Sequence, residues 1–337
     1  MVKKLIKERI LEIYDDIVIS SRVRLARNVR GLNFHTQLTN VEEAESITNA
    51  VYEAINEKEE FRFQRLKHLN YNECVALQER HIISRELIEN KDISSYAISD
   101  DEHVIVMVCE EDHIREQCLY GGFNLLKAYD RINKLDNKII RKLDIAFDDT
   151  LGFITASPNN LGPGMRASCM MFLPALFKHG KIEHMIDEAR SKGLTVRGVF
   201  GEGSRALGYL YQISNQNSLG MTEEEIIDEV SEFVLKLCEY EDNLRGKILE
   251  ESYDEIKDSS ARAYGILKNA HILSEEELYK QLSELKLGVV LGLMMLKEPE
   301  ELDKLYYEAG KANLLERFGD KRPENILRAE YIRDRLK

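Results

Sequence analysis

A turn-rich loop between two apolar runs constrains this chain more than any other stretch. The run from Leu151 to Ala156 predicts a short strand, and the following SPNNLGPG contains two prolines, two asparagines and two glycines. Because Gly and Asn accept left-handed backbone conformations, the amides of such a loop can approach a ligand closely. Arg166 follows, where we expect a helix to begin, and free N–H groups at a helix start favour an anion. The stretch predicts an anion-binding loop, with a surface turn before a core helix as the alternative. It matches neither of the common glycine-rich nucleotide motifs.

A cationic segment lies near the N-terminus, where a strand predicted at Ile17 to Ser20 continues into SRVRLARNVRG. Arginine recurs there at positions 22, 24, 27 and 30. Since side chains alternate along a strand, Arg22 and Arg24 project from the same face. Two adjacent guanidinium groups repel each other unless an anion lies between them, and each can bind phosphate in a bidentate manner. The segment predicts a polyphosphate site; a solvated basic strand is the alternative.

Acidic residues follow the buried strand that the β-branched run from Val104 to Cys109 predicts. The sequence EEDHIR, residues 110–115, comes directly after it. Strand ends commonly carry functional side chains, although an acidic turn can also be an ordinary solvated loop. Another candidate carboxylate, Glu202, lies between two glycines after a strand predicted from Leu194 to Phe200. His81 in QERHIIS is a further candidate, although a lone histidine is more often structural.

The pattern of apolar residues divides the chain into two parts. Strands interspersed with helices and joined by short turns predict an α+β fold, with an antiparallel or mixed sheet flanked by helices. Thr222, with Glu225 three residues later, predicts the N-cap of a long helix. From about Ser252 only amphipathic helices follow, with breaks near 270–274, 297–299 and 319–323. We therefore expect an α+β domain at residues 1–251 and a small all-helical C-terminal domain at residues 252–337. The further predicted elements are helices at Val41–Ile55, Gly122–Ile140 and Ile182–Lys192 and a strand at Tyr209–Ser214, while Tyr71–Ile88 is ambiguous between helix and strand.

Composition excludes several classes of function. A net charge of −13 argues against a nucleic-acid partner, because such proteins normally carry a basic face. The five cysteines include no C-x-x-C pair, which indicates reduced thiols in a cytoplasmic protein. The N-terminus lacks the apolar core of a signal peptide, and the longest apolar run, Leu287 to Leu296, is too short to cross a bilayer. We expect no membrane partner.

Five motifs resemble those of the phosphagen (guanidino) kinases, in the order found there: SRVRLARN, EEDHIR, SPNNLGPGMRAS, RGVFGE and YQISN. The resemblance covers about residues 15–245, and MRASCMMFLPAL and RGVFGEGSRALG are similar to the bacterial branch that phosphorylates arginine in proteins. It implies a glutamine-synthetase-like catalytic fold that binds ATP with magnesium (Mg2+). It also implies transfer of the γ-phosphoryl group to arginine side chains of protein substrates. It implies no protein ligand for the magnesium ion, because the ion is held mainly by ATP.

The resemblance also implies roles for individual residues. Glu111 and Glu202 match the two carboxylates that hold the target guanidinium and act as base. Ser157 and Asn160 fall in the region that faces this guanidinium. The resemblance also implies a set of ATP-binding residues. The arginines of this set match a clamp for the phosphates, and the histidine matches a nucleotide contact. The set consists of Ser21, Arg22, Val23, Arg24, Leu25, His81, Arg115, Arg166, Ala167, Ser168, Cys169, Met170, Arg197, Gly198, Val199, Phe200, Gly201 and Glu202.

Two departures from the family pattern stand out. The family usually has cysteine at the position of Ser157, and a serine hydroxyl is not anionic at neutral pH. Protein-arginine kinases also carry an RDxxRA motif that binds phosphoarginine and regulates the enzyme. Here Arg333 and Asp334 begin RDRLK, so the second arginine is replaced by lysine and the alanine is absent. The resemblance therefore implies an allosteric phosphoarginine pocket at Arg333 and Asp334 that binds more weakly than the full motif would.

Partners also follow from the resemblance alone. It implies a zinc-finger activator of the McsA type, the CtsR repressor, and the ClpC–ClpP protease that degrades arginine-phosphorylated clients in a stress response, as well as a possible homodimer. Two alternatives remain open. One is a kinase for a small free guanidino compound. The other is a weakly active or non-catalytic phosphoarginine-binding adaptor, which Ser157 makes plausible.

Overall fold

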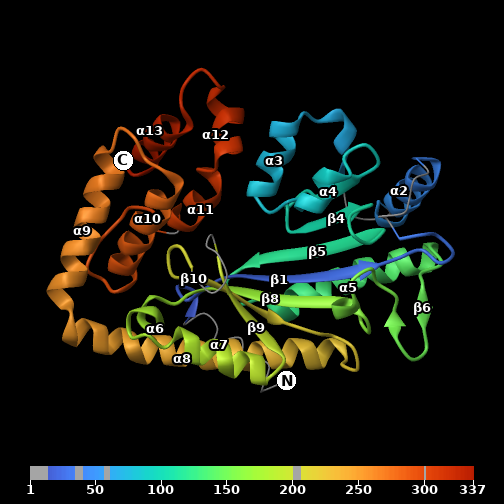
Figure 1. Ribbon diagram of the computed structural model, residues 1–337, viewed down its shortest axis with the longest axis horizontal. Helices are drawn as coiled ribbons and strands as arrows, with labels where there is room; N and C mark the ends of the chain where they lie inside the picture. The colour runs from blue at the N-terminus through green and yellow to red at the C-terminus, as the bar shows by residue number, and fades with distance from the viewer. Residues whose placement is uncertain (1–13, 35–40, 57–60, 200–205, 300) are drawn as a thin grey trace.

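A single antiparallel sheet of eight strands organises the protein (Figure 1). The computed structural model describes residues 14–34, 41–56, 61–199, 206–299 and 301–337. The strand order is β2-β3-β4-β5-β1-β8-β10-β9, so the arginine-rich strand β1 lies in the middle of the sheet. The strands are β1 (Val18–Arg27), β2 (Phe61–Arg65), β3 (Ser95–Ser99), β4 (Val104–Val108), β5 (Ile114–Gly121), β8 (Met165–Phe172), β9 (Leu194–Gly198) and β10 (Leu210–Asn215). A separate hairpin joins β6 (Phe147–Asp148) and β7 (Gly152–Phe153).

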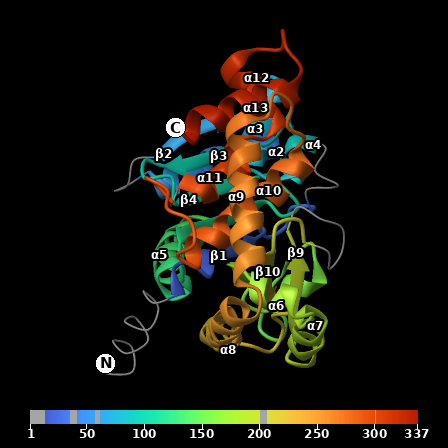
Figure 2. The ribbon, with the colours of Figure 1, turned by 90° about the vertical axis from the view of Figure 1, so that its left-hand side faces the viewer.

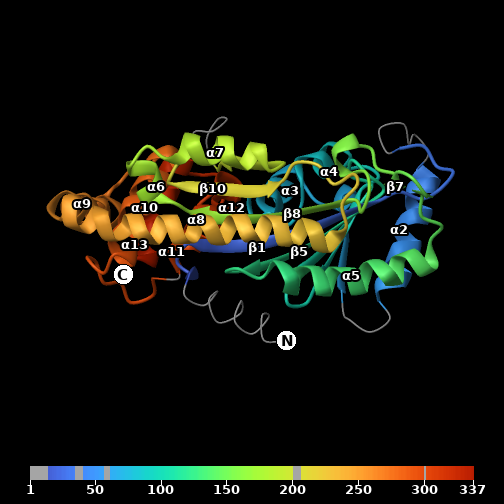
Figure 3. The ribbon, with the colours of Figure 1, turned by 90° about the horizontal axis from the view of Figure 1, so that it is seen from below.

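One face of the sheet is covered by helices and forms the main apolar core (Figure 3). These helices are α2 (Val41–Ile55), α5 (Leu125–Lys142), α7 (Ile182–Ser191) and α8 (Glu223–Glu251). The strands contribute the side chains of every second residue, such as Val23 and Leu25 of β1 and Ala167 of β8. Burial of this face follows from the amphipathic helices, whose apolar residues recur at helical spacing.

Among the described residues, the helices that pack on the opposite face lie at its two ends. At one end, α3 (Tyr71–Glu79) and α4 (Arg85–Glu89) pack on β3 and β4 around Ile105 and Met107. At the other end, Phe172 and Leu210 pack against the C-terminal helices. Because α9 rises past the end of the sheet from α8, the helices after it lie on the side opposite to α8 (Figures 1 and 2). Two pockets open over the middle of this face, beside two groups of helices that are distant in sequence.

The C-terminal helices share an apolar core that also includes Phe172 and Leu210 of the sheet. They are α9 (Tyr253–Asn269), α10 (Glu275–Val290), α11 (Glu301–Glu308), α12 (Lys311–Phe318) and α13 (Glu324–Arg335). The breaks predicted from the sequence are confirmed, as is the capping box of Thr222 and Glu225 that begins α8. No described helix has the length and apolar character needed to span a bilayer.

The structure corrects two predictions around the central loop. We expected a helix from Arg166, but residues Met165–Phe172 form strand β8, and α6 (Pro174–Lys178) begins only afterwards. The apolar run MMFLPAL hides the alternation of a strand, because β8 lies between β1 and β10 and is largely buried on both faces. The strand expected from Leu151 to Ala156 is reduced to the two residues of β7. The ambiguous stretch from Tyr71 to Ile88 contains two short helices, α3 and α4.

Candidate active site

Five arginines lie on the open face of the sheet: Arg22 and Arg24 on β1, Arg115 on β5, Arg166 on β8 and Arg197 on β9. Residues paired directly across antiparallel strands point to the same face. Arg24 is paired with Arg166, and the strand registers bring the other three to the same side. β8 therefore delivers Arg166 to the site by strand pairing and not, as we expected, by a helix start.

The central arginines carry hydrogen-bond donors without acceptors. The buried Nε atoms of Arg24 and Arg166 have no hydrogen-bond partner, while Nη2 of Arg166 donates to Oγ of Ser214 at 3.0 Å. Burial, followed by the charges of Arg115 and Arg166, lowers the pKa of Arg22 to about 10. The pKa of Arg24 is also lowered, first by burial and then by its arginine neighbours. An anion with several oxygen atoms would supply acceptors and cancel this repulsion.

The EEDHIR segment divides into structural residues and one residue that faces the arginines. Asp112 is buried and accepts hydrogen bonds from Nδ2 of Asn28 and from the backbone N–H of Ala156, both at 2.6 Å. His113 is also buried; its Nδ1 accepts from the N–H of Val29 at 3.0 Å. These contacts tie the end of β1 and the central loop to the turn after β4. Two of the conspicuous polar residues therefore hold the site together and do not enter it.

Glu110 and Glu111 have different environments although they are adjacent. Glu110 is fully buried and forms an ion pair with Arg115. Glu111 is half-buried and lines a pocket of about 120 Å³. Burial, then the negative charges of Asp112 and Glu110, raise the pKa of Glu111. A carboxylate with a raised pKa is a stronger base, which suits a proton acceptor.

This smaller pocket joins the arginines to the central loop. Besides Glu111, its lining includes three arginines and four loop residues: Arg24, Arg115, Arg166, Ser157, Asn159, Asn160 and Gly164. Gly164 has a φ of +64°, and a Cβ atom there would lie 2.7 Å from the carbonyl oxygen of Ala26. Only glycine lets the loop approach β1 so closely. The predicted residues Ser157 and Asn160 are thus brought beside both Glu111 and the arginines.

A second pocket, of about 490 Å³, opens over the same arginines toward α3 and the C-terminal helices. His81 lies at the end of α3 and lines this pocket with Arg22 and Gln117. Desolvation within the pocket and the positive charge of Arg22 lower the pKa of His81 to about 4. The ring is therefore neutral at pH 7.

Several residues predicted for the nucleotide site lie elsewhere. The side chains of Ser21, Val23, Leu25, Ala167 and Cys169 are buried on the helix-covered side, although Leu25 also lines the smaller pocket. This follows from strand alternation, since the resemblance marks continuous segments whereas only every second side chain reaches the open face. Burial raises the pKa of Cys169 to about 12, so this thiol is unreactive.

The remaining predicted residues fall into three groups. Ser168 and Met170 lie on the arginine face of β8 by their register. Gly198 ends β9, and Val199 packs on the C-terminal core. Phe200, Gly201 and Glu202 lie outside the described residues.

The predicted phosphoarginine residues have separate partners. Arg333 donates to the carbonyl oxygen of Ala270, whereas Asp334 is exposed and accepts from Nζ of Lys337 at 2.6 Å. Neither lines the two pockets over the arginines. The phosphoarginine pocket stays a prediction.

Sequence reasoning missed the contribution of the C-terminal helices. Tyr279, Tyr306 and Tyr307 line the larger pocket. Their positions fit the helical periodicity of an ordinary core, so no sequence signal separates them from structural tyrosines. Within the described ranges, no group of three or more His, Cys, Asp or Glu side chains is placed to hold a metal ion.

Comparisons with known proteins identify the family. The model of the ATP:guanido phosphotransferase C-terminal catalytic domain matches residues 42–244, and that of the protein-arginine kinase McsB C-terminal domain matches residues 253–337. The chain belongs to the protein-arginine kinase family. It is 38% identical to the protein-arginine kinase of Clostridium kluyveri, over 95% of this chain and 94% of the relative. It is 39% identical to that of Bacillus subtilis, over 95% and 90%. The resemblance to phosphagen kinases is confirmed, and the protein is a phosphotransferase.

The fold is also similar to that of solved phosphagen kinases. A duplicated taurocyamine kinase from Schistosoma mansoni, with bound transition-state analog components, superposes with a TM-score of 0.59 at 28% identity. The match covers 68% of this chain and 33% of that chain, so this protein spans about a third of its length.

Proposed function

We propose that this protein transfers the γ-phosphoryl group of ATP to the guanidinium groups of arginine side chains in proteins. The observation that carries the proposal is the smaller pocket, where half-buried arginines with unpartnered donors meet Glu111 and the central loop. Membership of the protein-arginine kinase family supports the substrate class.

The arginine face fits the phosphates of ATP. The orphaned Nε atoms of Arg24 and Arg166 require acceptors, and phosphate oxygens match guanidinium donors. Arg22 and Arg115 would hold the rest of the chain of phosphates. The transferring phosphoryl group carries spread negative charge, which fixed arginines stabilise without reorganisation. Magnesium, when bound, would neutralise further phosphate charge, held mainly by ATP itself.

Glu111 is the proposed base for the acceptor. A guanidinium group is a poor nucleophile because its positive charge is delocalised and its pKa is above about 12. A carboxylate beside it can orient one nitrogen toward the phosphorus atom and accept the proton that leaves this nitrogen. We propose Glu202 as the second carboxylate. Ser157 would contact the guanidinium only as a neutral hydroxyl, so we expect lower activity than with the cysteine usual in the family.

The test is mass spectrometry of an arginine-rich protein after incubation with ATP and magnesium, with preparation that avoids acid. We expect ATP-dependent phosphoarginine, and its loss in Glu111→Gln, which keeps the size of the side chain but removes its charge. A parallel incubation with free arginine separates the alternatives. Phosphorylation of free arginine alone would indicate a small guanidino substrate, and absence of turnover with either acceptor would indicate an adaptor.

We propose that arginine phosphorylation marks clients for ClpC–ClpP in a cytoplasmic stress response, with a McsA-type activator and CtsR as partners and a homodimer as the assembly. We also propose that residues 1–251 and 252–337 are separate domains; the two family models, which meet near residue 250, support this division.

A further inference from the structure

The lining of the larger pocket combines cationic with aromatic side chains. It includes Arg22, Arg24 and Arg115 together with His81 and Tyr307. Its volume of about 490 Å³ lies between the sheet, α3 and the C-terminal helices. ATP has two matching parts, the anionic phosphates and the aromatic base. Aromatic side chains bind bases by stacking on their π-faces.

His81 is held over the arginine face by an unusual helix end. It follows the last turn of α3 with a φ of +58°, a conformation that usually requires glycine. Its N–H donates to the carbonyl oxygen of Gln78 at 2.9 Å, and Ile82 N–H donates to that of Leu77 at 3.0 Å. Nε2 of Gln117, which points from β5 on the arginine face, donates to the carbonyl oxygen of His81 at 2.9 Å. These bonds fix a residue whose neutral ring is accessible within the pocket.

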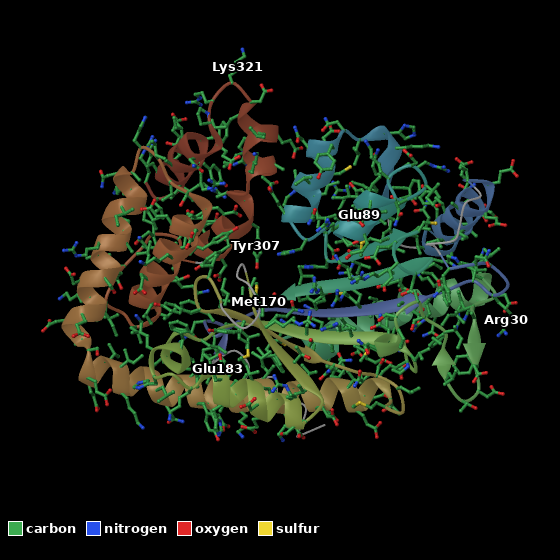
Figure 4. All side chains as sticks on the ribbon, in the orientation of Figure 1. Arg30, Glu89, Met170, Glu183, Tyr307 and Lys321 are labelled. Atoms are coloured by element: carbon green, nitrogen blue, oxygen red, sulfur yellow. The ribbon has the colours of Figure 1, made fainter. Side chains whose placement is uncertain are left out.

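Tyr307 reaches the same point from α11. Its ring lies edge-on to that of His81, with centroids 4.9 Å apart and an interplanar angle of 76°. Its hydroxyl donates to Sδ of Met170, on the arginine face, at 3.3 Å, and Figure 4 shows Tyr307 beside Met170 at the end of the sheet. The adjacent Tyr306 differs, because it is buried and its hydroxyl is bonded to Oγ of Ser283 at 2.6 Å. Tyr307 is half-buried and faces the pocket.

Glu79 joins α3, which precedes His81, to the start of α12, the helix that follows Tyr307 and α11. It lies two residues before His81, and its carboxylate accepts from the N–H groups of Ala312 and Asn313, each at 2.9 Å, at the start of α12. Nδ2 of Asn313 donates to the same carboxylate at 2.8 Å. A Cβ atom on Gly310 would lie 2.4 Å from Glu79, so only glycine allows this close contact between α3 and the turn after Tyr307.

We propose that Tyr307 binds the nucleoside of the phosphoryl donor, with the base lying against the His81–Tyr307 ring pair, and that Glu79 is a positioning residue for Tyr307. The C-terminal helices then complete the nucleotide site of the catalytic sheet. The inference rests on the proposed function, since it assumes ATP as the donor.

The test compares binding of ATP with that of inorganic tripolyphosphate, which lacks a nucleoside, by calorimetry on the full chain. Tyr307→Leu keeps an apolar side chain but removes the aromatic ring. It should weaken ATP binding by on the order of tenfold and leave the binding of tripolyphosphate unchanged. Tyr307→Phe keeps the ring and should bind ATP nearly as the parent does. Tyr253→Leu, an exposed tyrosine on α9, is the matched control and should change neither ligand.

Glu79→Gln tests the positioning role by kinetics. It should raise KM for ATP several-fold with kcat at saturating ATP unchanged, because the chemistry does not involve Glu79. The inference would be overturned if Tyr307→Leu weakened the binding of ATP and of tripolyphosphate equally, or weakened neither. Arginine phosphorylation by the parent protein would in that case still support the proposed function. A parent protein that binds neither ligand would overturn both.

Discussion

Arg24 and Arg27 lie three residues apart on β1, and alternation places them on opposite faces of the sheet. Arg27 is fully buried and satisfied: its Nε and Nη2 donate to the two carboxylate oxygens of Asp136 at 3.0 and 2.7 Å, and Nη1 donates to the carbonyl oxygens of Ala26 and Pro163. Arg24 has a buried Nε without any acceptor and neighbouring positive charges. Satisfaction of the guanidinium by acceptors therefore distinguishes Arg27 from Arg24.

The face of the sheet that carries the five arginines lowers the stability of the folded protein. Adjacent positive charges destabilise the folded state, although Arg115 forms an ion pair with Glu110, and sites shaped for a ligand commonly trade stability for function. On the other face, the Arg27–Asp136 pair contributes to stability because each partner would be strongly unfavourable alone. Substitutions on the two faces should thus have opposite effects on activity and stability.

The largest effect is expected at Arg166. Arg166→Ala should lower turnover by on the order of a thousandfold, as removal of an arginine from a phosphoryl-transfer site commonly does. Its melting temperature should be unchanged or raised, because repulsion among the arginines is relieved. Steady-state kinetics and calorimetric unfolding measure both quantities. Unchanged kinetics in a folded variant would mean that this face is structural.

Arg27 should show the reverse behaviour. Arg27→Met leaves the carboxylate of Asp136 buried without its cation, and we expect the free energy of unfolding to fall by about 3–5 kcal/mol. The double variant Arg27→Met with Asp136→Leu removes both charges and should recover most of this loss. Urea denaturation tests the pair; a single variant as stable as the parent would contradict the comparison.

Glu116 gives the helix-covered face a pH dependence. Burial, followed by the charge of Asp136, raises the pKa of Glu116 well above its ordinary value. Folding therefore favours its protonated form, so its contribution to stability is complete below about pH 4.5 and is lost as pH rises toward the raised pKa. Glu116→Gln should be stabilising relative to the parent above that pH, with a gap that widens by at most about 1.4 kcal/mol per pH unit. A gap that is constant from pH 4 to pH 8 in urea unfolding would contradict this.

The smallest effect is expected at Ser157. A cysteine introduced there can be compared with Cys169, which is buried on the helix-covered face. Ser157→Cys introduces a thiol beside Arg24, Arg115 and Arg166, whose charges should lower its pKa. Activity should rise several-fold, most clearly above neutral pH, and the introduced thiol should react with iodoacetamide. Cys169, whose pKa is raised by burial, should not. A pH–rate profile identical to that of the parent would show that a thiolate is not used here.

Local patterns in the sequence were sufficient for much of the fold. Alternation along β1 placed Arg22 and Arg24 on one face, helical periodicity located α2 at its observed bounds, and the capping box located the start of α8. These features depend on interactions between residues close in the chain, which a sequence displays directly. The order of the family motifs was likewise sufficient to identify the family.

The tertiary structure decided which polar residues enter the site. Strand pairing moved Arg166 from an expected helix start to the middle of the sheet, and long-range hydrogen bonds made Asp112 and His113 structural while Glu111 faces the arginines. The approach of Tyr307 to His81 joins residues more than two hundred positions apart. Such contacts depend on how packed elements cover the two faces of the sheet, and a strand buried on both faces or a helical tyrosine carries no local mark of that choice.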